Sequence, residues 1–255
     1  MTPEEASAWA RDGYFVREAS YTPDECNTLI AAAERAAADA SARVSVGETY
    51  LLDGKRFVDC EHVTVQFEHS PGSENIKVIE PVNAFDPAFE ALVDDPRITA
   101  PIRGLLTAET LSLWTAKLNL KRPGVGSGFG WHQDSPYWIH DHDDVDHLPN
   151  VMVTFDDADA ANGALAVLIG SHRHGCLPGT DDGSQLGGFY TDPAAIDGAA
   201  EVVIEAPAGS LIFFSPHIVH GSRPNKSARP RRAMVLTYQS GLRPTLKSRS
   251  LRKVL

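Results

Sequence analysis

The pattern of hydrophobic and polar positions changes near residue 110. Before that point, two segments open with a threonine, a proline and two acidic residues, beginning at Thr2 and Thr22. A capping hydroxyl, a first-turn proline and acidic first-turn residues are typical of a helix start. The second segment runs through an alanine-rich stretch, which predicts a helix to about residue 40. A short strand is expected between the two helices, at 14–16.

After residue 110, short β-rich runs recur, separated by clusters of Gly, Pro, Asn and Asp. No helix-length periodic segment lies between them, so an antiparallel sandwich, barrel or jelly roll is favoured over parallel βαβ units. The chain is therefore expected to be mainly β, with N-terminal helices that buttress the β core. We expect one domain over 1–255, with a mostly helical part, a β core and a basic tail at 1–110, 111–240 and 241–255. The predicted strands are 111–121, 151–155, 164–169, 202–205, 210–214 and 233–239.

The composition is that of a globular chain rather than a membrane or disulfide-rich protein. Of 255 residues, 42% are hydrophobic and 22% charged, which is enough apolar material for a sizeable core. No apolar run reaches the roughly 20 residues of a membrane span, and the polar N-terminus does not resemble a secretory signal. Three cysteines without a CxxC spacing argue against disulfides and cysteine zinc sites. A cytoplasmic location is expected.

Charge is unevenly distributed along the chain. The net charge is −11, yet residues 221–255 hold ten of the 23 basic residues and none of the 34 acidic ones. The acidic remainder disfavours non-specific binding to nucleic acid. The basic segment is interpreted as a closing segment that docks on the acidic body, with a nucleic-acid arm as the less favoured alternative.

A candidate metal site begins in the Gly-rich segment that ends in His132-Gln133-Asp134. If this segment is a strand, residues i and i+2 face the same side, so His132 and Asp134 would point into one pocket. His220 follows an apolar strand and offers a third ligand. Two histidines and one carboxylate form the facial triad of non-haem Fe(II) oxygenases.

Two other histidines compete with this assignment. His142 and Asp144 form a second His-x-Asp match, but they lie in a polar run that is interpreted as a solvated loop. His217 lies three residues before His220, and the His-Gly-Ser sequence that starts at His220 favours the latter.

The order of these motifs resembles the phytanoyl-CoA dioxygenase (PhyH) family. The resemblance rests on His132-Gln133-Asp134, Asn162-Gly163-Ala164-Leu165, Gly170-Ser171-His172, His220-Gly221-Ser222 and Arg231. It implies a double-stranded β-helix, a cupin-like jelly roll. It also implies an Fe(II)- and 2-oxoglutarate-dependent dioxygenase that uses O2 and releases succinate and CO2. Related halogenases lack the carboxylate ligand, so Asp134 makes halogenation less favoured than hydroxylation.

The resemblance also implies a site for 2-oxoglutarate. Arg231 follows His220 at the family's spacing, and its planar guanidinium suits a carboxylate. Arg232 stays an alternative because only the strand register separates the two. Ser222 and Asn119 match family positions that contact the same co-substrate. Thr115, Lys117, Asn119 and Lys121 would share one strand face, which makes Lys117 a weaker candidate.

The substrate is expected to be a small-molecule metabolite, with no nucleic-acid or membrane partner; the oligomeric state is left open. Trp138, Tyr137 and Phe129 flank the proposed metal strand and are candidate substrate contacts, and no catalytic residue is expected beyond the metal centre. Gln66 to Glu68 are candidates to line the pocket. Segments 40–70 and 175–200 are interpreted as irregular loops that act as lids. Alternatives are desaturation, epoxidation or cyclisation by the same iron chemistry, or a cupin-type metalloenzyme or sensor that does not use 2-oxoglutarate.

Overall fold

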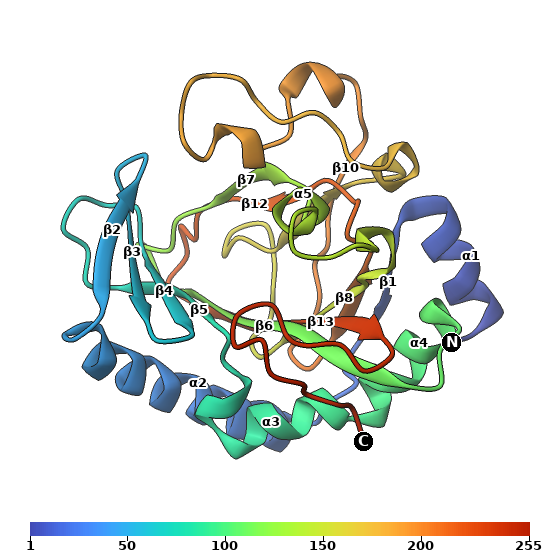
Figure 1. Ribbon diagram of the computed structural model, residues 1–255, viewed down its shortest axis with the longest axis horizontal. Helices are drawn as coiled ribbons and strands as arrows, with labels where there is room; N and C mark the ends of the chain where they lie inside the picture. Colours follow the sequence, from blue (N-terminus) through green and yellow to red (C-terminus); the bar gives the residue numbers. More distant parts are fainter.

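The computed structural model describes all residues, 1–255, and forms two antiparallel β-sheets, with four of the five α-helices on the outer side of the larger sheet (Figure 1). The helices are α1 (Pro3–Asp12), α2 (Pro23–Val44), α3 (Pro87–Asp94), α4 (Pro96–Leu106) and α5 (Ser135–Trp138). The strands are β1 (Tyr14–Arg17), β2 (Glu48–Leu52), β3 (Lys55–Cys60), β4 (Val63–Phe67), β5 (Ile76–Glu80), β6 (Leu111–Lys121), β7 (Phe129–His132), β8 (Asn150–Thr154), β9 (Leu165–Leu168), β10 (Glu201–Val203), β11 (Leu211–Phe214), β12 (His220–Ser222) and β13 (Arg231–Ser240).

The large sheet has nine strands in the order β1-β11-β8-β13-β6-β5-β4-β3-β2, and the small sheet has four in the order β10-β9-β12-β7. The long strands β6 and β13 pair along their whole length at the centre of the large sheet. The mainly β fold, buttressed by helices, is the one expected, and each predicted strand of the β core is present within a few residues of its predicted ends.

Both N-terminal helices begin as the sequence predicts. Thr2 and Thr22 accept hydrogen bonds from Glu5 N and Glu25 N, and each glutamate side chain binds back to the backbone N–H of its threonine. This reciprocal capping satisfies two N–H groups that a helix start otherwise leaves free. The alanine-rich stripe of α2 is buried, so the helix packs closely on the large sheet.

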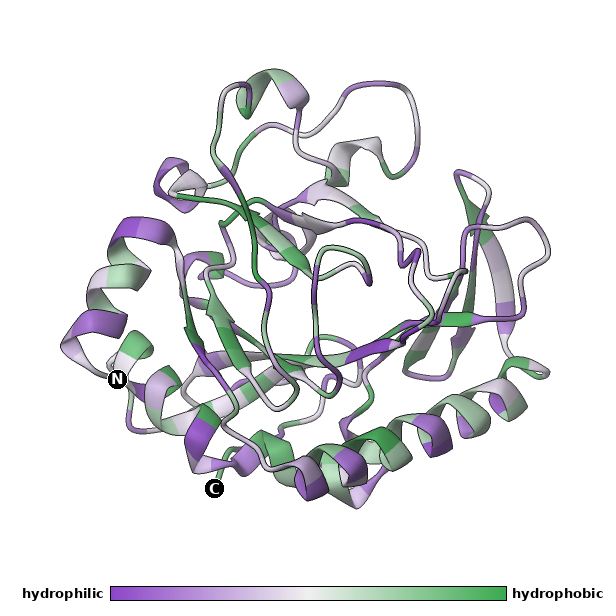
Figure 2. Ribbon diagram, turned by 180° about the vertical axis from the view of Figure 1, so that it is seen from behind, coloured by the Kyte–Doolittle hydropathy of each residue, from purple (hydrophilic) through white to green (hydrophobic).

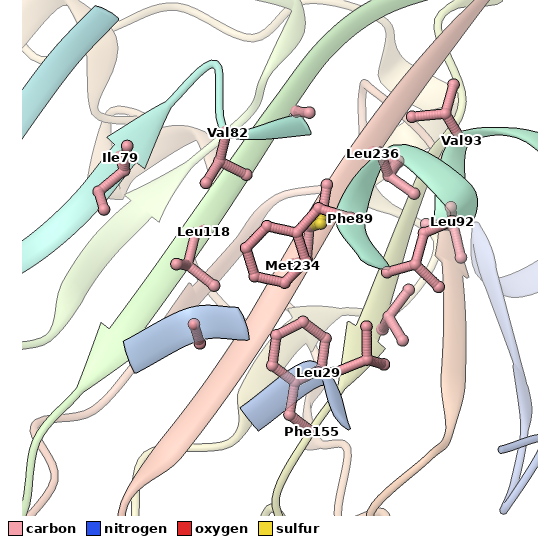
Figure 3. Packing of buried hydrophobic residues seen from close by; sticks show 14 of the residues in the cluster. Leu29, Ile79, Val82, Phe89, Leu92, Val93, Leu118, Phe155, Met234 and Leu236 are labelled. Carbon is pink, nitrogen blue, oxygen red and sulfur yellow. The ribbon is translucent and has the colours of Figure 1, made fainter. Parts of the chain in front are cut away.

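Alternation along the strands separates a helix-facing core from an inner face. Leu118 of β6, Met234 and Leu236 of β13 join Phe89 of α3 and Phe155 in the main core of 34 buried residues (Figure 3). The hydropathy colouring shows the apolar sides of the helices against this sheet (Figure 2). The alternate residues of β6, β8 and β13 therefore face the small sheet. Nine buried residues drawn from both sheets and neighbouring segments form a second cluster there: Met152, Leu165, Val167, Ile204, Ile212, Phe214, Ile218, Ala233 and Val235.

Two sequence interpretations need correction. Residues 40–70 are not an irregular loop, because they contain β2, β3 and β4. The turn between β2 and β3 is Asp53-Gly54 with φ of 49° and 72°, the left-handed pair that a two-residue hairpin turn requires. The His142 segment is not simply solvated either. His142 packs edge-on against Trp114 at 5.0 Å, and its Nε2 lies 3.0 Å from Gln239 Oε1.

The basic C-terminal segment docks on acidic side chains, as the charge distribution suggested. Arg243 pairs with Asp143, and Arg249 pairs with Asp141. Arg252 binds Asp94 at 2.8 Å and also contacts Glu90. None of the helices combines the length and the apolar composition that a membrane span requires.

Candidate metal centre and co-substrate pocket

The three predicted metal ligands meet between the two sheets. Side-chain donor atoms of His132, Asp134 and His220 all lie within 4.8 Å of one another. His132 on β7 is directly opposite His220 on β12, and their ring centroids are 4.2 Å apart. Strand pairing therefore joins two residues that are distant in sequence.

Asp134 reaches the site by a route that differs from the one predicted. The strand ends at His132, and Asp134 adopts a helical conformation just before α5. Its backbone N–H and that of Ser135 both donate to Pro216 O at 3.1 Å, which fixes the turn. Asp134 Oδ2 lies 3.8 Å from His220 Nε2 and accepts a hydrogen bond of 2.9 Å from Asn150 Nδ2. Asp134 does lie beside the two histidines, as predicted. The predicted reason, alternation with His132 along one strand, is wrong because the strand ends at His132.

The hydrogen bonds of both imidazoles suit a metal. His132 Nδ1 lies 2.8 Å from Gly130 O, and His220 Nδ1 lies 3.0 Å from Ile218 O. A carbonyl oxygen only accepts, so each Nδ1 carries the proton and each Nε2 presents a lone pair. Metal-binding histidines are oriented by a donated bond of this kind.

Charge in the site favours a cation. Burial, followed by the neighbouring His220, lowers the pKa of His132 to about 3, so this ring is neutral. Burial opposes ionisation of Asp134, but the fields of His220, Lys117 and His132 and the Asn150 amide together lower the pKa of its carboxyl. A neutral imidazole and an ionised carboxylate are the protonation states that bind a divalent metal.

Arg231 points inward and has spare hydrogen-bonding capacity. It is 2% exposed, and its Nη2 donates to Gly163 O at 2.9 Å, but its Nε and Nη1 have no partner. Burial lowers the pKa of Arg231 to about 10, which still leaves it charged at neutral pH. Gly163 has φ of 81°, and a Cβ there would collide with Arg223 O, so the Asn162-Gly163 motif provides the close approach.

Arg232 faces the opposite side of β13. Its guanidinium binds Asp156 at 2.7 Å and Glu34 of α2 at 3.0 Å. Its hydrogen-bonding capacity is therefore used on the helix side of the sheet, away from the metal ligands.

Two buried lysines beside Arg231 were missed as candidates. Lys121 is the register partner of Arg231, and Lys77 of β5 donates to Gly128 O at 2.8 Å; each is 1% exposed. Burial and the neighbouring cations lower the pKa of Lys121 to about 6 and that of Lys77 to about 7, although Glu68 acts in the opposite direction. Only the shared inner face of β6 hinted at Lys121, and no pattern in the sequence indicated Lys77.

Glu68 is the one carboxylate of this basic pocket, as the interpretation of segment 66–68 allowed. It is 2% exposed and accepts hydrogen bonds from Ser127, while its Oε1 has no partner. One guanidinium and two lysines thus lie around a single carboxylate in a buried space. A bound anion would favour the charged forms of both lysines and would pair with Arg231, so the pocket suits an anion.

The other candidate co-substrate residues lie on nearby strands. Asn119 is half-buried on β6, opposite Ala233, and Ser222 is half-buried on β12, opposite Phe129. Lys117 Nζ lies 4.0 Å from Asp134 Oδ1 and 4.0 Å from Glu80 Oε1, so it is beside the metal ligands rather than beside Arg231.

The three candidate aromatic residues have different surroundings. Phe129 covers the lysines, with its ring centroid 3.9 Å from Lys77 Nζ. Tyr137 contacts His132 edge-on and stacks on Phe189 at 4.4 Å. Trp138 is 1% exposed, and its ring centroid lies 5.3 Å from Lys117 Nζ. Phe189, from the predicted lid, carried no signal in the sequence.

The segment 175–200, which the sequence predicts to be a lid, is held to the β2–β3 hairpin. Asp53 accepts hydrogen bonds from Gln185 N at 2.9 Å and Leu186 N at 2.6 Å, and Lys55 Nζ donates to Tyr190 Oη at 2.7 Å. This segment brings Phe189 against Tyr137, which contacts His132, and Tyr190 forms a β-bridge with His132.

Asp53→Ala is expected to loosen this lid. Loss of the carboxylate removes two charge-assisted hydrogen bonds, so amide hydrogen exchange at Gln185 and Leu186 should rise about tenfold. Hydrogen exchange followed by mass spectrometry of peptides from 178–192 measures the change. Asp39→Ala, which removes only the pair with Arg43 on α2, serves as the control. Equal exchange in both variants would contradict the role of Asp53.

The chain is similar to a known protein family, to characterised enzymes and to a solved structure. The model of the phytanoyl-CoA dioxygenase (PhyH) family matches residues 9–233. An ectoine dioxygenase from Bordetella parapertussis is 26% identical and covers 94% of this chain and 76% of its own. An L-proline trans-4-hydroxylase from Streptomyces griseoviridis is 27% identical over 66% of this chain and 68% of its own. The crystal structure of EctD from S. alaskensis with 2-oxoglutarate and 5-hydroxyectoine has a TM-score of 0.72 and 25% identity, and covers 94% of this chain and 76% of that one.

The protein is therefore a jelly-roll oxygenase with a His-Asp-His site. It belongs to the phytanoyl-CoA dioxygenase (PhyH) family. It is an Fe(II)- and 2-oxoglutarate-dependent dioxygenase that hydroxylates a small metabolite, as the resemblance in the sequence implied.

Proposed function

We propose that His132, Asp134 and His220 hold Fe(II), and that Arg231 anchors the distal carboxylate of 2-oxoglutarate. The observation that carries the first assignment is the convergence of three donor groups within 4.8 Å, with each Nδ1 bound to a backbone carbonyl. The free Nε and Nη1 of buried Arg231 support the second, because a carboxylate would satisfy both.

The remaining pocket residues position the co-substrate and the ligands. Ser222 and Asn119 contribute neutral contacts to 2-oxoglutarate, and Lys77 and Lys121 lie at the Arg231 end, where a bound carboxylate would raise their pKa values and favour their charged forms. Lys117 lies at the metal end of the pocket, where its ammonium group faces the Asp134 carboxylate. Asn150 fixes the Asp134 carboxylate and is itself held by Thr237 Oγ1 at 2.6 Å.

Each part of the site then has a chemical task. Fe(II), when bound, supplies the activation of O2 that accompanies oxidative decarboxylation of 2-oxoglutarate to succinate and CO2. The protein orients the two reactants through fixed imidazole, carboxylate and guanidinium groups. Tyr137, Phe189 and the lid shield the reacting atoms from water.

The polar groups near the metal end favour a small zwitterion as the substrate. Glu80 and Lys117 face each other at 4.0 Å, and Thr115 Oγ1 donates to Glu80 at 2.6 Å. A carboxylate and an ammonium side by side complement a compact substrate that carries both charges. Ectoine dioxygenases and the proline hydroxylase among the relatives act on small molecules of this kind.

An anaerobic titration followed by a substrate screen tests the proposal. Fe(II) and then 2-oxoglutarate are added to the full chain, and a visible charge-transfer band is expected only with both. Succinate release is then measured with ectoine, L-proline, and neutral and apolar compounds of similar size, and the zwitterions should stimulate it most. Product mass separates hydroxylation from desaturation, epoxidation or cyclisation. A folded protein without the band would favour a cupin-type enzyme or sensor that does not use 2-oxoglutarate.

A further inference from the structure

A second group of hydrogen-bonded side chains lies beside the proposed iron ligands. Cys176 Sγ is 3.4 Å from Ser135 Oγ and 3.8 Å from His217 Nδ1. Ser135 Oγ is 2.8 Å from His217 Nδ1, and His217 Nε2 is 2.7 Å from Asp146 Oδ1. A thiol, a hydroxyl, an imidazole and a carboxylate thus form one continuous chain of contacts.

The carboxylate of Asp146 determines which atoms donate and which accept in this series of hydrogen bonds. Asp146 Oδ1 accepts, so His217 Nε2 carries the proton and Nδ1 presents its lone pair to Ser135 and Cys176. The serine hydroxyl donates to Nδ1 and accepts from the thiol. The imidazole is therefore oriented to take the thiol proton through the hydroxyl, which is the nucleophile–base–carboxylate arrangement of activated thiols.

The other two thiols have no such environment. Cys26 is buried and Cys60 is half-buried, whereas Cys176 is exposed. Burial raises the pKa of both the Cys26 and the Cys60 thiols, which disfavours the reactive thiolate. We propose that Cys176 is a site of reversible modification by low-molecular-weight disulfides, activated by His217 and Asp146.

The reaction is a thiol–disulfide exchange. The Cys176 thiol loses its proton to His217 through Ser135, and its sulfur attacks one sulfur of the disulfide. A new S–S bond to Cys176 forms, the old S–S bond breaks with release of the other thiolate, and the proton on His217 passes to that thiolate or to solvent. The small disulfide is the oxidant, and an added dithiol reverses the step.

Gln133 couples this site to the proposed iron ligands. Its Nε2 donates to Gly175 O at 2.8 Å and to His217 O at 2.5 Å, and its Oε1 accepts from Leu177 N at 2.7 Å. One buried amide thus binds the backbone on both sides of Cys176, and it belongs to the residue between His132 and Asp134. A bulky group on Cys176 Sγ would disturb this bridge and weaken iron binding. This coupling, unlike the reactivity, rests on the proposed function.

The reactivity is tested on the full chain without metal, using 5,5′-dithiobis(2-nitrobenzoate) at pH 7. We expect one fast absorbance phase, which Cys176→Ser removes while it retains turnover. His217→Gln and Asp146→Asn should each slow this phase about fivefold to tenfold, since a free thiol at this pH is only a few per cent ionised. Asp146 is exposed, so Asp146→Asn should fold normally. It therefore tests the same hydrogen-bonded chain even if His217→Gln fails to fold. A fast phase that survives Cys176→Ser, or an unchanged rate in both other variants, would overturn the proposal.

The coupling is tested with oxidised glutathione. Mass spectrometry should find the adduct on Cys176, and the Fe(II) concentration that half-saturates the charge-transfer band should rise about tenfold and return after dithiothreitol. The same treatment of Cys176→Ser should change nothing. An unshifted titration of the adduct would reject the coupling alone. Absence of the band in untreated protein would instead reject the proposed function.

Discussion

Replacing His132, Asp134 or His220 by alanine is expected to reduce succinate formation more than about a hundredfold, because changes that only disturb a ligand's supporting hydrogen bonds already cost up to that much. The three donor groups lie within 4.8 Å of one another, so each variant would remove one ligand of the proposed iron site. Turnover with saturating Fe(II) and 2-oxoglutarate measures the effect, and circular dichroism checks the fold.

Asn150→Ala and His147→Ala provide matched controls for this series. Asn150 orients the Asp134 carboxylate but is not one of the three donor groups, so its loss should produce a partial defect of about tenfold to a hundredfold. His147 is an exposed histidine paired with Asp144, and its replacement should leave turnover unchanged. Full activity in any one of the three ligand variants would reject the assignment of that residue.

Arg231→Ala is expected to raise the KM for 2-oxoglutarate by about two to three orders of magnitude, because loss of one partner of a buried charge pair typically costs 2–5 kcal/mol. Binding of Fe(II) alone should change little, since Arg231 is not among the donor groups. Steady-state kinetics at varied 2-oxoglutarate measure the first effect, and anaerobic isothermal titration calorimetry with Fe(II) alone measures the second.

Arg232→Ala is the natural control, because the neighbouring side chain binds Asp156 and Glu34 on the opposite face of β13. It should lower stability without raising this KM. If Arg232→Ala weakens 2-oxoglutarate binding and Arg231→Ala does not, the assignment of the anchor is wrong by one residue.

The sequence was most informative where local chemistry fixes local structure. The threonine caps of α1 and α2 and the eleven residues of β6 appear in the structure as predicted, because capping and alternation act over a few residues. The family's spacing favours Arg231 over Arg232, but the sequence alone leaves the register of β13 open. Only the pairing of Arg231 with Lys121, and of Leu236 with Val151, sets which side faces inward.

The other features of the site could not be predicted, because they depend on contacts between segments that are distant in the sequence. Lys77 reaches the basic pocket because β5 pairs with β6, and Glu68 because it accepts from Ser127. Neither pairing has a local signal. The sequence predicts an irregular lid over 40–70, whereas the structure has strands there, and their hairpin tip contacts the 175–200 segment through Asp53.

Because His132 lies opposite His220, a bound ferrous ion would link two neighbouring strands of the smaller sheet. β7 and β12 are only four and three residues long, and an ion held by one residue from each strand would bind the paired state alone. At a hundred times its dissociation constant, such a ligand adds about 2.7 kcal/mol to the free energy of unfolding. The catalytic ion would then also stabilise the fold. Loss of iron would therefore lower the stability of the protein as well as its activity.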